Sequence, residues 1–158
     1  MELNTRGRYA VMAMADLAKY GSDGATALPV ISERQKLSVS YLEQIFSQLR
    51  QAGLVESVRG RAGGYRLARA AAEISVAEVM RAVEEDTRMT RCAAGETAVG
   101  CLGHSKCLTH GLWAALGQHI QDFLGAVTLH DVAEGMPGWE RQVAFAGALS
   151  DQRRISVE

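Results

Sequence analysis

Residues 29–67 have the pattern of two helices, a short turn and a basic hairpin. Pro29 suits the first turn of a short helix that runs through residue 35. Residues 36–38 form a brief turn before a longer helix over about 39–52, whose apolar positions recur at helical spacing. The expected buried positions of this longer helix are Leu42, Ile45, Phe46 and Leu49. Two helices joined by about three residues are typical of a helix-turn-helix.

A glycine- and arginine-rich turn at 59–64 separates two short strand candidates, 54–58 and 65–67. A basic hairpin directly after a helix-turn-helix is a wing. No acidic residue lies between Ser57 and Ala72, so a local positive patch is expected there. Its members are Arg59, Arg61, Arg66 and Arg69. A helical corner or a solvated hairpin alone would be weak evidence, but both in this order favour DNA binding.

The start of the longer helix carries the side chains expected to reach DNA. These are Ser40, Tyr41, Glu43, Gln44 and Ser47. Gln44 could pair with adenine, and Glu43 could accept from a cytosine amino group. Ser40 and Glu43 also fit a capping box, so Glu43 has a structural alternative of equal weight. Arg59 and Arg61 at the wing tip are expected to meet the minor groove or phosphates.

The charge distribution agrees with DNA binding by the first half of the chain. The 158 residues have a net charge of −1, but residues 1–70 carry ten Lys/Arg against six Asp/Glu, and residues 71–158 carry seven against twelve. The first residues are polar and charged, unlike a signal peptide, and no apolar run approaches the roughly 20 residues of a membrane span. We therefore expect a cytoplasmic protein whose thiols stay reduced.

All three cysteines and two of the four histidines lie between residues 92 and 110. They are Cys92, Cys101, His104, Cys107 and His110. Thiolates and imidazole gathered in a reduced protein are ligands for zinc or an iron-sulfur cluster. Cys107 and His110 are expected on the first turn of a helix, where the helix N-terminus would stabilise a thiolate.

Four further helices are expected outside residues 29–52. The first follows Asn4 or Thr5 and ends near Gly21, and another follows a capping box at Ser75-x-x-Glu78 and runs to about Val83. The helix after residue 105 has a heptad-like seam, which we assign to dimerisation because helix-turn-helix proteins usually bind DNA as two-fold dimers. The seam residues are Trp113, Leu116, Ile120, Phe123 and Val127. A short helix capped by Thr128-x-x-Asp131 is expected to follow.

The predicted fold is mainly α with a small β-hairpin wing: a winged helix-turn-helix domain plus a long dimerisation helix. We divide the chain into a DNA-binding domain at 1–84, a metal-cluster loop at 85–104, and the dimerisation helix with a short following helix at 105–134. A C-terminal tail occupies 135–158. The sequence does not decide whether this tail is helical or disordered.

Over residues 1–134 the chain resembles a bacterial family of winged-helix transcription regulators that includes iron-sulfur and nitric-oxide sensors. The specific motifs are Arg6-Gly7-Arg8-Tyr9-Ala10-Val11, Ser40-Tyr41-Leu42-Glu43-Gln44, Val58-Arg59-Gly60 through Gly63-Gly64-Tyr65, and Cys107-Leu108-Thr109-His110 leading to Leu112-Trp113. The resemblance implies a homodimer that binds a double-stranded DNA operator and controls iron-sulfur assembly genes. It also implies a [2Fe-2S] cluster, delivered by the iron-sulfur assembly machinery, with ligands Cys92, Cys101, Cys107 and His110.

The chain departs from the family pattern between the first two cysteines, where eight residues replace the usual five. A three-residue insertion in a glycine-containing loop costs little closure entropy, so ligation can survive it. The insertion leaves room for Glu96 or His104 to compete as fourth ligand, although His110 is preferred. One neutral imidazole among three thiolates should raise the cluster's reduction potential and make it labile.

The same residues do not exclude other occupants of the site. A [4Fe-4S] cluster that senses nitric oxide, or structural zinc, uses a similar ligand set. An electron carrier is a third possibility, but it would have little use for a wing. No nucleotide-binding loop, paired acid and base or nucleophile motif is present, so we do not expect an enzyme.

Overall fold

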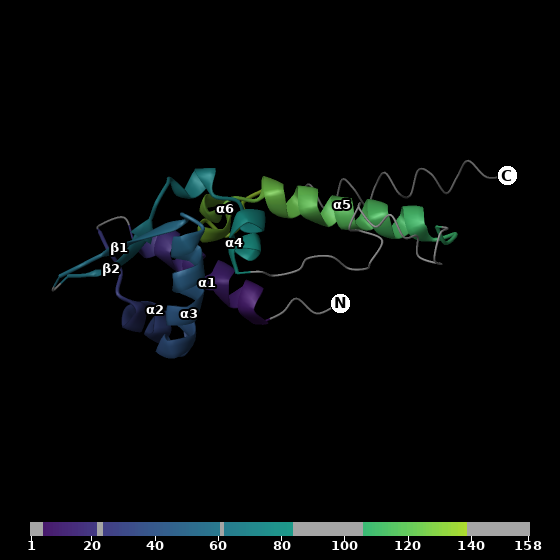
Figure 1. Ribbon diagram of the computed structural model, residues 1–158. Helices are drawn as coiled ribbons and strands as arrows, with labels where there is room; N and C mark the ends of the chain where they lie inside the picture. Colours follow the sequence, from purple (N-terminus) through teal and green to yellow (C-terminus); the bar gives the residue numbers. More distant parts are fainter. Residues whose placement is uncertain (1–4, 22–23, 61, 84–105, 139–158) are drawn as a thin grey trace.

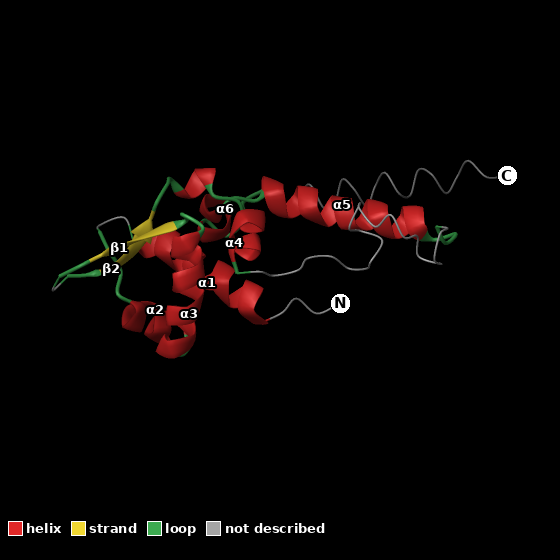
Figure 2. Ribbon diagram, in the orientation of Figure 1, coloured by secondary structure: helices red, strands yellow, loops and turns green. Residues whose placement is uncertain are grey.

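The computed structural model describes residues 5–21, 24–60, 62–83 and 106–138. Within these ranges the chain is mainly helical with one antiparallel hairpin (Figure 2). The hairpin and the long helix α5 (His110–Ala126) extend from opposite sides of a helical body (Figure 1). The predicted fold class is therefore confirmed.

Three helices form the helix-turn-helix and its support. They are α1 (Thr5–Tyr20), α2 (Leu28–Gln35) and α3 (Val39–Gln51). Pro29 lies in the first turn of α2, as predicted, and Lys36 ends that helix in the left-handed conformation with a φ of 56°. The four apolar residues predicted for the buried face of α3 are all buried in the main core.

Helix α3 begins with a different cap from the one predicted. Ser38 is the N-cap, and its side chain accepts the backbone N–H of Tyr41 at 3.3 Å. The predicted capping box at Ser40 and Glu43 is therefore wrong, because Ser40 already lies inside the helix. Since Glu43 is exposed on the second turn, the structural role that competed with DNA contact is removed.

The wing consists of β1 (Val55–Val58) and β2 (Gly64–Leu67), paired from Val55 with Leu67 to Val58 with Gly64. Thr26 adds a single bridge to the hairpin: its N–H donates to Tyr65 O at 2.8 Å, and the Tyr65 N–H donates to Thr26 O at 2.9 Å. The Tyr65 ring also lies 4.8 Å from the Phe46 ring, centroid to centroid. The hairpin is thus attached to the helical body by its second strand.

The segments after the wing and after α5 pack on the same helical body. After the 3-10 turn η1 (Ala71–Glu73), helix α4 (Val76–Ala82) begins with the predicted Ser75–Glu78 capping box. Helix α6 (Leu129–Ala133) begins with the predicted Thr128–Asp131 box and packs on α1, where Leu129 is fully buried. Two backbone bonds join these helix starts, from Val76 N–H to Val127 O and from Leu129 N–H to Ile74 O, both at 2.9 Å.

A buried carboxylate connects α1 with the end of α2. The Asp16 side chain is fully buried and accepts from Arg34 Nη2 at 2.6 Å and from Gln35 Nε2 at 2.7 Å. The Arg34 guanidinium also lies 4.6 Å above the Tyr20 ring. This cluster fixes the first helix of the helix-turn-helix just before its turn.

Candidate DNA interface and metal-binding turn

The exposed face of α3 presents the side chains that the sequence assigned to DNA. Ser40, Glu43 and Gln44 are exposed, and they line an open groove together with Ser47 and Gln48. Such a row of small and amide side chains on the second helix of a helix-turn-helix suits the major groove. Tyr41 differs from this expectation because it is half-buried and packs edge-on against Tyr9, with ring centroids 5.9 Å apart.

Arg6, in the first turn of α1, lines the same groove. Sequence reasoning did not assign it to the interface, although it lies in a short basic run with Arg8. Arg6 and the exposed Glu43 both line this groove, so the groove contains a cationic and an anionic side chain. A carboxylate repels phosphate, so a DNA contact by Glu43 would have to be with a base edge, where cytosine offers a donor.

The predicted positive patch on the wing is smaller than expected. Arg66 pairs with Glu56 across the hairpin at 2.8 Å, and Arg69 pairs with Glu78 of α4 at 2.9 Å. Both carboxylates lie just outside the stretch of sequence that lacks acidic residues. Arg59 is exposed and has no ion-pair partner in the part of the chain that the structure describes, whereas Arg61 lies outside the described residues. Arg59 is therefore the described wing residue best suited to DNA.

The candidate metal-binding stretch is described only at its C-terminal end. Cys92, Cys101 and the competing Glu96 and His104 lie outside the described residues. Among the residues that are described, no group of three or more His, Cys, Asp or Glu side chains forms a metal site. The proposed four-residue ligand set therefore stays a prediction.

Cys107 and His110 occupy a turn that leads into α5. The predicted helix starts later than expected, at His110, so Cys107 precedes the helix and lies in the turn before it. The His110 N–H donates to Cys107 O at 3.1 Å, and the Cys107 sulfur lies 3.5 Å from Thr109 Oγ1. Cys107 is a half-buried free cysteine that lies three residues before the first residue of α5. This turn suits two adjacent ligands of a soft-metal centre.

Helix α5 exposes apolar side chains along its length. Leu112 and Phe123 are exposed, and Trp113, Leu116 and Ile120 are half-buried. Val127 does not extend this seam as predicted, because it follows the last helical residue and is buried. It packs against Val76 and Met80 of α4. The C-terminal end of α5 is thus fixed to the winged-helix body.

Comparison with known proteins identifies the family. Residues 3–135 match Rrf2, described as an iron-dependent transcriptional regulator. The chain belongs to the Rrf2 family. A transcriptional regulator IscR from Xenorhabdus nematophila is 51% identical over 134 residues, which cover 85% of this chain and 80% of the relative. An IscR from Photorhabdus laumondii is 51% identical over 132 residues, covering 84% and 79%.

Solved structures agree with this Rrf2 assignment. CymR, the global cysteine regulator of B. subtilis, matches with a TM-score of 0.72 and 33% identity over 85% of this chain and 97% of its own. IscR of T. potens matches with a TM-score of 0.70 and 36% identity over 85% and 87%. This Rrf2 protein is thus a DNA-binding transcriptional regulator with a winged helix. No helix in its described part is long and apolar enough to cross a membrane.

Proposed function

We propose that this Rrf2 regulator senses iron-sulfur cluster supply and adjusts transcription of iron-sulfur assembly genes. In this proposal a homodimer binds a double-stranded operator in the cytoplasm. A [2Fe-2S] cluster, received from the iron-sulfur assembly machinery, is held by Cys92, Cys101, Cys107 and His110. The similarity to IscR proteins supports the regulated process, and the ligand chemistry of residues 92–110 supports the cofactor.

One observation carries the proposal: the Cys107–His110 turn begins the same helix whose far end is fixed to the winged-helix body. The turn leads directly into α5, and the end of α5 packs through Leu124 and Val127 onto α4. A change of ligation at the turn would thus act on a helix joined to the DNA-binding body. A bound cluster would supply a redox-sensitive, labile link between the turn and the loop before it.

This chain's own residues do the rest. Cys107 and His110 would supply two of the cluster ligands at the N-terminal end of α5. The exposed apolar side chains of α5, including Leu112 and Phe123, would bury against the second copy of the helix. The groove along α3 and the exposed Arg59 then contact successive grooves of the operator.

Anaerobic purification tests this proposal. We expect a coloured dimer with two iron and two sulfide per protomer, and each of Cys92→Ser, Cys101→Ser and Cys107→Ser should be a colourless but folded dimer. Four iron per protomer would favour a [4Fe-4S] nitric-oxide sensor instead. Stoichiometric zinc without sulfide would indicate a structural metal, and a coloured Cys107→Ser protein at full occupancy would overturn the ligand set.

A further inference from the structure

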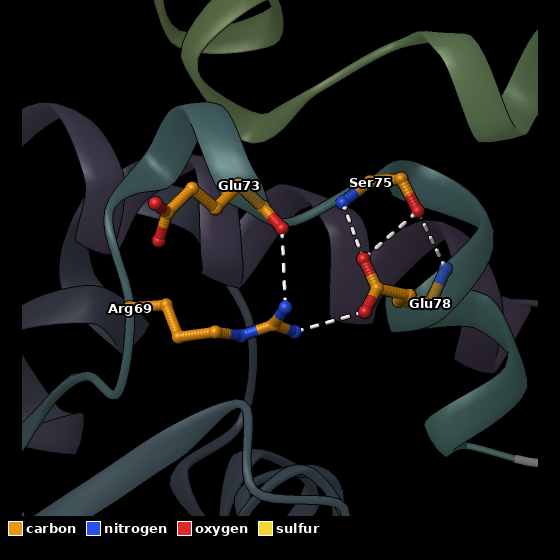
Figure 3. Close-up of polar contacts among 4 residues, drawn as sticks. All are labelled: Arg69, Glu73, Ser75 and Glu78. Atoms are coloured by element: carbon orange, nitrogen blue, oxygen red, sulfur yellow. Dashed lines mark hydrogen bonds and ion pairs between the residues drawn. The ribbon is translucent and has the colours of Figure 1, made fainter.

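Arg69, just beyond the wing, is hydrogen-bonded to α4, the helix that precedes the predicted metal-cluster loop at 85–104. Arg69 lies two residues after the end of β2. Its Nη2 donates to Glu78 Oε1 of α4 at 2.9 Å, and its Nη1 donates to the backbone O of Glu73 in η1 at 3.2 Å. Figure 3 shows the guanidinium between the two groups. One side chain thus joins three successive segments: residues 68–69 directly after β2, here called the wing stem, then η1 and α4.

The Glu78 carboxylate also caps the N-terminus of α4. Its Oε2 accepts the backbone N–H of Ser75 at 2.9 Å and the Ser75 hydroxyl at 3.1 Å, while Ser75 Oγ accepts the Glu78 N–H at 3.2 Å (Figure 3). One carboxylate oxygen therefore caps α4, and the other holds Arg69. The arginine hydrogen bond and the Ser75 N–H keep the pKa of Glu78 below its ordinary value, so the carboxylate stays charged.

The pair lies where three functional parts of the protein converge. It borders an open groove whose opposite wall is the C-terminal half of α3, with Gln48 and Gln51. The helix start that it caps is bonded to the end of α5, since Val76 N–H donates to Val127 O. This contact therefore lies next to helix α3, the wing stem and the C-terminal end of α5, the proposed dimerisation helix.

We propose that Arg69 and Glu78 are positioning residues for operator binding: their ion pair holds the wing stem on α4 so that the wing tip and α3 contact DNA together. Neither side chain needs to touch DNA. The inference rests on the proposed operator binding, but not on which metal the protein holds. Loss of the pair removes the side-chain link from Arg69 to α4, while the hairpin, its bridge to Thr26 and the backbone hydrogen bond from Ala68 N–H to Leu54 O stay in place.

The direction in which one substitution changes operator affinity distinguishes this positioning role from a simple effect of net charge. Glu78→Gln removes a negative charge, which by charge alone strengthens binding to a polyanion. If the ion pair positions the wing, the same change weakens operator binding, because the neutral amide holds the guanidinium less firmly. The chain also offers a matched control. Asp131 caps α6 in the same way as Glu78 caps α4, through Thr128 N–H at 2.9 Å and the Thr128 hydroxyl at 2.7 Å.

The test uses full-length protein of equal metal content and an operator selected from random DNA by the wild type. Fluorescence anisotropy across a salt series gives affinity and salt slope. We expect Glu78→Gln and Arg69→Gln each to weaken operator binding about fivefold with the salt slope unchanged, as loss of a partly exposed charged hydrogen bond implies. Arg69→Lys should recover part of the loss, and Asp131→Asn should change affinity less than about twofold.

Three results would overturn the inference. Glu78→Gln could bind as tightly as the wild type or more tightly, or Asp131→Asn could lose as much affinity as Glu78→Gln. Alternatively, Arg69→Gln could lower the salt slope by about one, which would make Arg69 a phosphate contact. A wild-type protein that selects no operator would overturn the proposed function as well, so the two failures are distinguishable.

Discussion

Gly64→Ala should destabilise the protein because the backbone of another segment occupies the place of the new methyl group. A Cβ at Gly64 would lie 2.3 Å from Thr26 O, 2.4 Å from Thr26 C and 2.7 Å from Ala27 N. All three are backbone atoms, so no side-chain rotation relieves the overlap. Strand β2 must instead move away from Thr26.

That movement breaks the bridge between Thr26 and Tyr65. Its two hydrogen bonds, of 2.8 and 2.9 Å, contribute about 1 kcal/mol each. Alanine also restricts the unfolded chain, which offsets the loss by about 0.4–1 kcal/mol. We therefore expect the free energy of unfolding to fall by about 1–2 kcal/mol, and operator affinity to fall because the wing is displaced.

Urea denaturation at one protomer concentration measures this change. The matched control is Gly125→Ala in α5, where a Cβ meets nothing within 4 Å. There the same substitution should stabilise the protein by about 0.5–1 kcal/mol, because alanine favours the helix. If Gly64→Ala proves as stable as the wild type, the bridge to Thr26 does not anchor the wing.

Three further predictions concern charged residues. Asp16→Ala should lower the free energy of unfolding by about 2 kcal/mol, because Arg34 and Gln35 lose the buried carboxylate that accepts their hydrogen bonds. Glu56→Ala breaks only the exposed pair with Arg66, so it should lower the free energy of unfolding by less than about 0.5 kcal/mol in the same urea titration. The hydrogen bond from Arg69 lowers the pKa of Glu78 from its ordinary value of 4.5. The hydrogen bond from the Thr128 hydroxyl likewise lowers the pKa of Asp131 from its ordinary value of 3.8. Since these groups bind protons more weakly when folded, their stabilisation is complete above the ordinary values and is lost as pH falls through the folded ones; a urea midpoint that declines below about pH 4, and declines less in Glu78→Gln, checks this. Arg59→Ala should weaken binding to all DNA sequences and reduce the slope of log affinity against log salt concentration by about one, because one phosphate contact is lost. An unchanged slope in the anisotropy assay would show that Arg59 does not contact the DNA backbone.

Local sequence signals predicted most of the helices and their ends. Pro29 marked the first turn of α2, and the Ser75–Glu78 and Thr128–Asp131 pairs marked the starts of α4 and α6, because each signal acts within one helical turn. The error at α3 shows the limit of such signals. Ser38 and Ser40 are both plausible caps, and the choice depends on where the preceding turn ends, which Lys36 sets by its left-handed conformation.

Contacts between distant segments were not predictable in this way. The partners of Arg66 and Arg69 depend on the hairpin register and on where α4 folds back, so a search within residues 57–72 overestimated the positive patch. The bridge between Thr26 and Tyr65 likewise joins segments far apart in sequence. Apolar spacing could not show that Val127 packs on α4, because the helix ends one residue earlier. The candidate ligands were named from their residue types and spacing alone, and their role as ligands is still a prediction.

In the proposed mechanism, ligation by residues between 92 and 110 controls how the dimer binds its operator. The most direct measurement compares operator affinity of anaerobically prepared wild-type protein with that of Cys107→Ser, in both cases with iron and sulfide determined per protomer. We expect a coloured wild type and at least a tenfold difference in operator affinity between the two folded dimers, about 1.4 kcal/mol. A colourless, iron-free wild type, or equal affinity of the two proteins, would contradict it.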